Sequence, residues 1–366
     1  MSSEASGRPG IAVVGSGSIG AAWAIVFAEA GCPVNLQDID AAHLENARRG
    51  IRARLSDLAQ CELLGEPVDL VLARIRFHSG LPDALANVAY VQECIPEDRE
   101  LKRSLFADLD RLADAATILA SSSSFLPASA FADGLAGRSR CLVVHPGNPP
   151  YLLRVAEVVP AAFTAQAVVE RTMDLLAAVG MGPVRLQREI DGFVFNRLQG
   201  ALLREAYCLV RDGIIDVAEV DRIVRDGLGL RWSVVGPFEA ADLNARGGIA
   251  AHAKRAGPVY FRLGTDRGQN DPWDDKLVAK VTAQRRAVMP LEDWEARVAW
   301  RDRALMALLR CRRSDSAFSE QVAGQGGRVV AQGAENRSTE QAEISSDGSR
   351  PRMQSATRRA DSGPNV

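Results

Sequence analysis

The segment from residue 11 to residue 38 constrains the fold more than any other part of the chain. An apolar run, IAVV, is followed by the turn GSGSIG, in which Gly15, Gly17 and Gly20 have the spacing G-x-G-x-x-G. A helical pattern, SIGAAWAIVFAEA, then ends at Gly31, and a second apolar run, PVNLQ, ends at Asp38. This order predicts a strand, a helix and a second strand, the unit that binds dinucleotides.

Each glycine of the turn has its own reason to lack a side chain. The first permits a tight turn, the second lets the backbone approach a pyrophosphate, and the third lets helix and strand pack closely. The free N–H groups and the dipole of the helix N-terminus attract phosphate. We therefore predict cofactor contacts from Gly15, Gly17, Ser18, Ile19 and Gly20. The alternative is a glycine turn of purely structural use.

Asp38 discriminates between dinucleotides. A carboxylate at the end of the second strand can hold a ribose diol and would repel a 2′-phosphate. No arginine or lysine lies just after it in the sequence. The pattern favours NAD over NADP, with FAD as the residual competitor.

Short apolar runs recur after this unit and predict the rest of a sheet. They lie at residues 88 to 95, 116 to 122, 141 to 145 and 155 to 159, and helical stretches such as 100 to 114 separate them. Alternation of this kind predicts an α/β domain with a Rossmann-like, doubly wound, mainly parallel sheet.

The pattern changes near residue 189. From residue 193 onward the apolar spacing is helical, whereas beyond residue 313 Ser, Gly, Gln and Arg dominate and too little apolar surface is available to offset the entropy of ordering. We predict a flexible N-terminus (1–9), an NAD-binding domain (10–189), an all-helical domain (190–313) for substrate binding and dimerisation, and a disordered tail (314–366).

Composition excludes several classes of function. A net charge of −2 over 366 residues leaves no excess of cations for nucleic acid. The N-terminus has no signal-peptide pattern and no apolar run approaches the roughly 20 residues that span a bilayer, so no membrane partner and a cytoplasmic location are expected. The six cysteines are scattered without nearby histidines, and no metal site is predicted.

A histidine and a glutamate in neighbouring apolar runs are the candidates for acid–base chemistry. His145 ends CLVVH, and ligands of doubly wound sheets bind outside the carboxyl ends of strands. A neutral imidazole can accept a hydroxyl proton while hydride leaves the same carbon. Glu157, within VAEVV, can orient that imidazole, and a buried carboxylate needs such a partner. The alternative is that His145 is a structural residue whose hydrogen bonds are satisfied.

Several motifs carry a family resemblance. GSGSIG, ECIPED, SSSS, HPGNPP with VAEVVP, and DGFVFNRL occur in the order of the 3-hydroxyacyl-CoA dehydrogenase superfamily. Over residues 10 to 312 the chain resembles this superfamily, and within it the lambda-crystallin and L-gulonate 3-dehydrogenase branch, through HPGNPPY, DGLGLRW and GPFEAADLNARGG. The resemblance implies that His145 is a general base, that Glu157 orients it, and that the helical domain forms a homodimer contact.

The resemblance also assigns roles to four other residues. It implies that the Ser124 hydroxyl touches the substrate oxygen and the nicotinamide; a helix cap is the alternative, and residues 121 to 123 are expected to have such a role. It implies that the amide of Asn196 holds the reacting oxygen, the alternative being a buried amide that ties the two domains together. Glu97 and Lys102 are implied to line the nicotinamide ribose, or else to form a solvated charge pair near a helix start.

Departures from the acyl-CoA enzymes weaken the transfer of acyl-CoA specificity to this chain. Ser122 stands where those enzymes commonly have asparagine, and Phe125 follows the implied active serine. Before GPFE the acyl-CoA enzymes usually have a small uncharged stretch, whereas this chain has Gly229, Leu230, Arg231 and Trp232. Both lambda-crystallin-like and carnitine-dehydrogenase-like proteins carry an arginine similarly, and both have substrates with a free carboxylate. Our hypothesis is that the planar guanidinium of Arg231 pairs with a substrate carboxylate. A salt bridge at the surface or between domains is the alternative.

The predicted function is NAD-dependent oxidation of the 3-hydroxyl of a small hydroxy acid, L-gulonate or a similar one, to a 3-keto acid. A short-chain 3-hydroxyacyl-CoA dehydrogenase and a carnitine-type dehydrogenase are the enzyme alternatives. A crystallin-like structural or NAD-sensing protein is the other alternative, because fold alone does not establish chemistry.

Overall fold

The computed structural model of the chain describes residues 7–233, 235–245, 248–267 and 290–314, with positions 276, 279, 283 and 287. By their contacts the residues divide into two units, Met1–Ala307 and Leu308–Val366. Residues 1–6 of the predicted flexible N-terminus (1–9) and residues 315–366 of the predicted disordered tail (314–366) lie outside the described residues.

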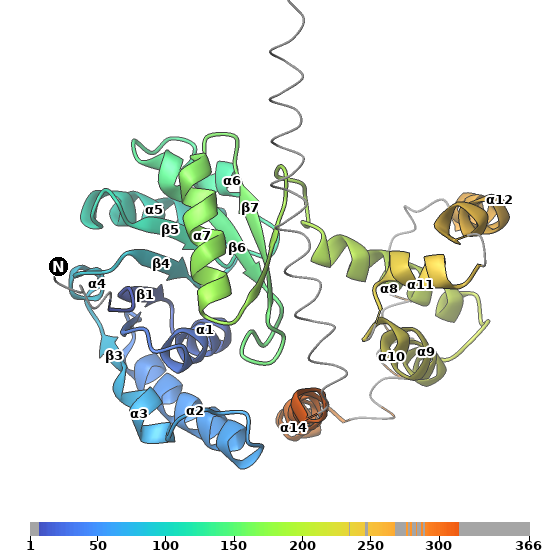
Figure 1. The fold of residues 1–366 in the computed structure, drawn as a ribbon, viewed down its shortest axis with the longest axis horizontal. Coiled ribbons are helices and arrows are strands. Elements are labelled where there is room, and N and C mark those ends of the chain that lie inside the picture. The colour runs from blue at the N-terminus through green and yellow to red at the C-terminus, as the bar shows by residue number, and fades with distance from the viewer. Residues whose placement is uncertain are drawn as a thin grey trace, which may run out of the picture. The chain divides into compact units, whose positions relative to one another are not determined.

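An eight-stranded sheet forms the first part of the chain (Figure 1), in the order β3-β2-β1-β4-β5-β6-β7-β8. Its neighbouring strands are parallel except for β6 and β7, which are antiparallel. The strands are β1 (Ile11–Val14), β2 (Val34–Gln37), β3 (Ile75–His78), β4 (Tyr90–Glu93), β5 (Ile118–Ser121), β6 (Cys141–Pro146), β7 (Val155–Pro160) and β8 (Gly182–Arg185).

Helices alternate with these strands, as the sequence predicts. They are α1 (Ser18–Glu29), α2 (Ala41–Gln60), α3 (Val68–Ala73), α4 (Leu81–Ala84), α5 (Arg99–Leu112), α6 (Ala128–Ala132), the 3₁₀ turn η1 (Arg138–Arg140) and α7 (Gln166–Ala178). The doubly wound, mainly parallel fold is confirmed. Two strands, β3 and β8, were not predicted.

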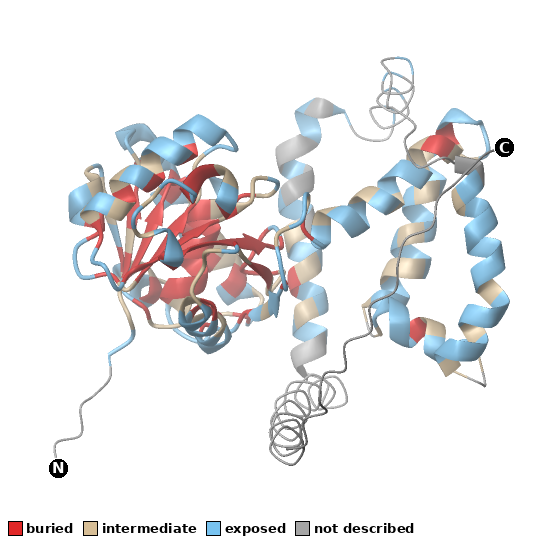
Figure 2. Cartoon of the chain, turned by 90° about the horizontal axis from the view of Figure 1, so that it is seen from above, coloured by how far each residue is buried: buried red, intermediate tan, exposed pale blue. Residues whose placement is uncertain are grey.

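The sheet and α1 contain much of the core. The central strands β1, β4 and β5 are buried along their whole length, and α1 is buried from Gly20 to Ala28, so it is apolar on all sides rather than along one stripe. The rings of Trp23 and Phe27 stack with centroids 5.3 Å apart, and the Phe27 ring lies 5.9 Å from that of Tyr90 in β4. Figure 2 shows these buried residues gathered in the sheet and the helix beside it.

Beyond β8 the described elements are helical, as predicted. They are α8 (Phe195–Arg211), α9 (Val217–Ile223), the π-turn η2 (Val224–Gly229), α10 (Leu230–Trp232), α11 (Pro237–Leu243), α12 (Gly248–Arg267), the 3₁₀ turn η3 (Leu291–Asp293) and α14 (Trp294–Ser314). Among the described helices, none is both long enough and apolar enough to cross a membrane.

The topology brings several chain segments to one edge of the sheet. Strands β1, β2, β4, β5 and β6 run in the same direction, so their carboxyl ends meet there. The glycine-rich turn follows β1, Asp38 follows β2, the segment with Glu97 follows β4, and Ser124 follows β5. His145 lies at the carboxyl end of β6. This edge is where ligands of doubly wound sheets bind.

Candidate active site

The glycine-rich turn has the geometry of a dinucleotide site. Gly15 has a φ of +96°, a left-handed conformation that residues with side chains rarely adopt. A Cβ on Gly20 would lie 1.8 Å from the carbonyl oxygen of Gly15, so the turn and α1 can pack only without that atom. A Cβ on Gly17 would meet no described atom within 4 Å. Gly17 therefore borders open space beside the N-terminus of α1, which no side chain caps.

Asp38 lies beside this turn and is bonded to it. Its Oδ2 accepts hydrogen bonds from the N–H of Ser16 at 2.9 Å and from its hydroxyl at 2.8 Å, and its Oδ1 accepts one from the N–H of Asp40 at 3.1 Å. Burial raises the pKa of Asp38, but these hydrogen bonds and the nearby His43 lower it further, so the net shift is downward. The carboxylate is ionised and 13% exposed, which suits it to accept hydrogen bonds from a ribose diol.

A cavity of about 320 Å³ opens at the same place. The turn contributes Ser16, Gly17 and Ser18 to its lining, and α2 contributes His43 and Arg54 among others. The open space at Gly17, the uncapped helix and the ionised Asp38 fit NAD. Sequence reasoning missed Arg54, because only the path of α2 back along the turn brings a residue in the middle of that helix to the cavity.

His145 and Glu157 form a buried pair. The antiparallel register of β6 and β7 places the two residues directly opposite each other. His145 Nδ1 lies 2.8 Å from Glu157 Oε2, and the side chains are 8% and 7% exposed. The rings of Phe193 and Phe195 lie beside the imidazole, with centroids 5.6 and 6.1 Å away. Within the described residues, His145 Nε2 has no hydrogen-bond partner, so this nitrogen can accept a proton.

The second oxygen of Glu157 binds the start of α8. Oε1 accepts hydrogen bonds from the N–H groups of Val194 at 2.7 Å and Phe195 at 3.0 Å. These amides have no partner inside a helix, and the dipole there favours a negative charge. Burial raises the pKa of Glu157, but the hydrogen bonds from His145, Phe195 and Val194 lower it further, so the net shift is downward. Glu157 is therefore a carboxylate that binds both the imidazole and the helix.

Ser124 lies in a turn between β5 and α6, and side chains from two other segments form hydrogen bonds with its backbone. Its N–H donates to Glu97 Oε2 at 3.2 Å, and its carbonyl oxygen accepts from Asn196 Nδ2 at 2.8 Å. Its hydroxyl has no partner in the part of the chain that the structure describes. Asn196 thus joins α8 to the turn, which is the kind of contact expected if this amide ties the two domains together. The second N–H of the same amide stays available for a ligand.

Lys102 does not form a solvated pair with Glu97, so that alternative is wrong. Its side chain is 1% exposed, and Nζ lies 2.8 and 2.9 Å from the two oxygens of Glu93, which is fully buried. The hydroxyl of Ser121 donates to the same carboxylate. Removing one partner of such a buried pair costs about 3 to 5 kcal/mol, so Lys102 stabilises this end of the sheet. A role of Lys102 and Glu97 at the nicotinamide ribose stays a prediction.

The expectation that residues 121 to 123 cap a helix is wrong for this group of serines, because α6 begins only at Ala128. Ser121 binds Glu93, and Ser122 Oγ accepts hydrogen bonds from Trp23 Nε1 at 3.1 Å and Gln92 Nε2 at 2.7 Å. Ser123 alone accepts a cap-like bond, from the N–H of Leu126. Ser122 therefore joins β4, β5 and α1 beneath the turn.

Arg231 is the predicted residue that the structure does not bring to these groups. It is exposed in α10, which packs against η2 and α11. Among the described residues it has no ion-pair partner, so a structural salt bridge does not account for it there.

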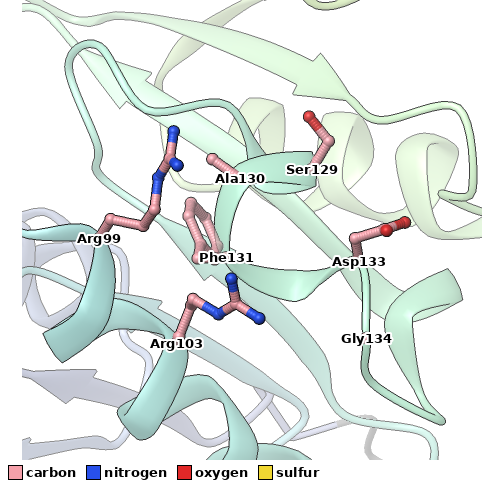
Figure 3. Close-up of a pocket in the computed structure, with 7 residues that line it drawn as sticks. All are labelled: Arg99, Arg103, Ser129, Ala130, Phe131, Asp133 and Gly134. Atoms are coloured by element: carbon pink, nitrogen blue, oxygen red, sulfur yellow. The ribbon is translucent and has the colours of Figure 1, made fainter.

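A second cavity lies between α5 and α6 (Figure 3). Its volume is about 340 Å³, and two exposed arginines of α5, Arg99 and Arg103, line it together with Phe131 and other residues of α6. Sequence reasoning singled out none of these residues.

The comparisons with known proteins agree with this geometry. Residues 10–190 match the model of the 3-hydroxyacyl-CoA dehydrogenase NAD binding domain, and residues 192–290 match that of the 3-hydroxyacyl-CoA dehydrogenase C-terminal domain. The chain belongs to the 3-hydroxyacyl-CoA dehydrogenase family. As a member of this family it is an NAD-dependent oxidoreductase that acts on a small hydroxy compound.

Similar proteins of this family fall on more than one branch. The lambda-crystallin homolog of Bos taurus is 43% identical and covers 84% of this chain and 97% of its own. An L-carnitine dehydrogenase of Streptomyces griseus is 36% identical and covers 82% and 89%. The solved structure of 5-formyl-3-hydroxy-2-methylpyridine 4-carboxylic acid 5-dehydrogenase, described as an NAD+ dependent dismutase, is 27% identical, covers 83% and 98%, and has a TM-score of 0.72. The predicted resemblance of this chain to the lambda-crystallin branch of the family is thus confirmed.

Proposed function

We propose that this dehydrogenase oxidises the 3-hydroxyl of a small free hydroxy acid, L-gulonate or a similar one, to a 3-keto acid, with His145 as general base. The observation that carries the proposal is the buried pair of His145 and Glu157, in which Nδ1 of the imidazole contacts the carboxylate and Nε2 has no partner among the described residues. Bound NAD+ supplies the acceptor for hydride. Residues of the chain transfer the proton and bind the substrate oxygen.

In the proposed mechanism His145 Nε2 takes the hydroxyl proton as the C–H bond of the same carbon breaks. Nδ1 donates to Glu157, so the tautomer with a free Nε2 lone pair is favoured, and the carboxylate stabilises the imidazolium that forms. The hydroxyl of Ser124 and the second N–H of the Asn196 amide hold the substrate oxygen as it becomes a carbonyl. The rings of Phe193 and Phe195 exclude water from the imidazole.

The substrate class is tested by a panel of alcohols. L-gulonate, L-carnitine and 3-hydroxybutyryl-CoA are each mixed with NAD+ and the purified chain, and the absorbance of NADH is followed. We expect kcat/KM for L-gulonate to exceed the values for the other two by at least tenfold. Preference for 3-hydroxybutyryl-CoA would assign the chain to the acyl-CoA enzymes instead, and preference for L-carnitine would assign it to the carnitine-type enzymes.

Arg231 is proposed to bind the carboxylate of the substrate. L-carnitine and the pyridine carboxylic acid of the relatives both carry a carboxylate, and an exposed arginine without an ion-pair partner among the described residues is suited to bind one. The contribution of charged hydrogen bonds predicts that Arg231→Met raises the KM for the hydroxy acid by roughly 10- to 100-fold. Steady-state kinetics measure this change.

Arg225→Met is the matched control, because Arg225 is an exposed arginine of η2 whose guanidinium binds its neighbour Asp226. It should leave KM unchanged. An Arg231→Met variant with the KM of the unaltered chain would remove Arg231 from the substrate site.

A homodimer is proposed from the helical elements. Large apolar side chains are strongly exposed there among the described residues: Phe238 is 82% exposed, Leu243 70%, Tyr260 62% and Phe261 76%. Most of the described residues of α11 and α12 are exposed. Apolar surface of this extent is typical of an interface. Sedimentation equilibrium should give twice the mass of the chain, whereas a single-chain mass at micromolar concentration would contradict the dimer.

A cytoplasmic location is likewise proposed. Cys32, Cys61, Cys94 and Cys141 are free thiols in the described structure, a pattern typical of reducing compartments. Fractionation of the source cells checks this, and recovery of the chain in an oxidising compartment would contradict it.

A further inference from the structure

The turn that carries Ser124 is organised around one carboxylate. Glu97 Oε1 accepts hydrogen bonds from the Ser123 hydroxyl at 2.5 Å and from the N–H groups of Phe125 at 3.0 Å and Leu126 at 2.9 Å. Its Oε2 accepts the N–H of Ser124 at 3.2 Å. Four donors from four consecutive residues thus converge on a side chain from the segment after β4.

This arrangement requires a charged acceptor. A neutral amide in place of the carboxylate has one oxygen and would turn an N–H group toward the fourth donor. Desolvation raises the pKa of Glu97, but the hydrogen bonds from Ser123, Leu126 and Phe125 and the charge of Lys102 lower it further, so the net shift is downward. Glu97 is therefore ionised when it holds the turn.

Asn196 holds the same residue from the other side. Its Nδ2 donates to the Ser124 carbonyl oxygen at 2.8 Å, so Glu97 fixes the N–H and Asn196 fixes the C=O of one residue. With both backbone groups held, the direction of the Cα–Cβ bond of Ser124 is set. Its hydroxyl has no partner among the described residues and can bind a ligand.

We infer that Glu97 is a positioning residue of the reaction: together with Asn196 it fixes the backbone of Ser124 so that the serine hydroxyl meets the reacting oxygen. This inference rests on the proposed function, because it takes Ser124 as the residue that contacts substrate. It differs from the predicted contact with the nicotinamide ribose. A ribose contact acts on the affinity for NAD, whereas positioning acts on turnover.

Glu97→Gln is the test. The substitution keeps the shape of the side chain but places an NH₂ group where Oε2 accepts the N–H of Ser124, so that one hydrogen bond is lost. We expect kcat to fall about 10- to 50-fold, since a small displacement of a group at the reacting centre is enough for such a loss. The dissociation constant of NADH, measured by its fluorescence, should change less than twofold. An unchanged kcat with a tenfold weaker NADH affinity would overturn the inference in favour of the ribose contact.

Glu100→Gln is the matched control. Glu100 is an exposed carboxylate in the first turn of α5, and it has no hydrogen bond to the turn that contains Ser124. The same chemical change there should leave kcat and NADH affinity as they were. An equal loss of kcat in Glu100→Gln would show that the charge of this region, rather than the four hydrogen bonds, is responsible.

Hydrogen exchange separates the inference from the proposed function. Amide exchange in a peptide covering residues 122 to 127, followed by mass spectrometry, should be at least tenfold faster in Glu97→Gln than in Glu100→Gln, because three amides lose or weaken their acceptor. Unchanged exchange would overturn the inference whichever substrate is turned over. If exchange rises as expected but no panel substrate reacts, the proposed substrate class fails while the role of Glu97 in holding the turn stands.

A double-mutant cycle with Asn196→Ala tests whether the two residues act on one group. Because Asn196 is also proposed to contact the substrate oxygen, the cycle is read by amide exchange in the peptide covering residues 122 to 127 rather than by kcat. If both residues act by fixing the turn at Ser124, exchange in the double variant should be little faster than in the faster-exchanging single variant, because a released turn cannot be released again. Increases in exchange that multiply fully would overturn joint action on Ser124.

Discussion

His145→Asn is expected to lower kcat about 1,000-fold and to leave the affinity for NADH within twofold of the unaltered chain. Asparagine can keep a hydrogen bond to Glu157 in place of Nδ1, but it has no basic nitrogen where Nε2 lies. General base catalysis contributes about 100- to 10,000-fold, and this contribution would be lost. Steady-state kinetics with the best panel substrate and a fluorescence titration of NADH measure the two quantities.

His252→Asn is a suitable control for that result. His252 lies in α12 beside Tyr260, apart from the residues assigned to the reaction. It should leave kcat unchanged. A His145→Asn variant that keeps more than a tenth of the original kcat would show that another group takes the proton.

Glu157→Gln is expected to lower kcat by roughly 100- to 1,000-fold through the tautomer of His145. The amides of Val194 and Phe195 will bind the glutamine oxygen, which turns its NH₂ group toward Nδ1. Nδ1 must then accept a hydrogen bond, so the ring proton moves to Nε2 and the base is blocked. Loss of the correct tautomer in a similar acid–histidine pair is known to reduce catalysis strongly.

The control for this variant is Glu189→Gln. Glu189 also accepts a hydrogen bond from a backbone amide, that of Ser129, but it has no contact with His145 among the described residues. It should leave kcat unchanged. Retention of kcat in Glu157→Gln would contradict the role of Glu157 as the orienting partner.

The same variant has a defined effect on stability against pH. Because the folded-state pKa of Glu157 is below its usual value, the ionised carboxylate contributes stability above about pH 4.3, and this contribution is lost as the pH falls through the folded-state value. The difference in free energy of unfolding between the unaltered chain and Glu157→Gln should therefore shrink between pH 6 and pH 3. Urea unfolding at several pH values checks the sign, and a difference that grows on acidification would contradict it.

Local patterns were enough to predict the first half of the fold. The spacing of Gly15, Gly17 and Gly20 between two apolar runs predicted β1, α1 and β2, because the φ of a turn and the approach of a helix depend on residues close in sequence. Strands β4 to β7 were predicted from buried apolar runs. The strand β8 was missed because it lies at the edge of the sheet, is mostly exposed and contains glycine and proline, and β3 was missed because IRFH is short and mixed.

The partners of the charged side chains could not be predicted from local patterns. The four donors on Glu97 and the amides at the start of α8 on Glu157 join segments 26 to 38 residues apart, whereas Lys102 of α5 reaches Glu93 of β4 only nine residues away. Sheet order and helix direction decide which of several carboxylates a cation meets, and residue spacing carries no signal of it. Arg54 shows the same, since the course of α2 brings it to the nucleotide cavity.

The sequence by itself determined that the chain would form a dinucleotide turn with an acidic strand end, and it singled out His145 and Glu157, because these features are set by short stretches of backbone and by burial. Only the tertiary structure decided how that site is held together. Hydrogen bonds to a carboxylate need donors within about 3 Å, and packing of distant strands and helices alone brings Val194, Phe195 and the turn at Ser124 that close.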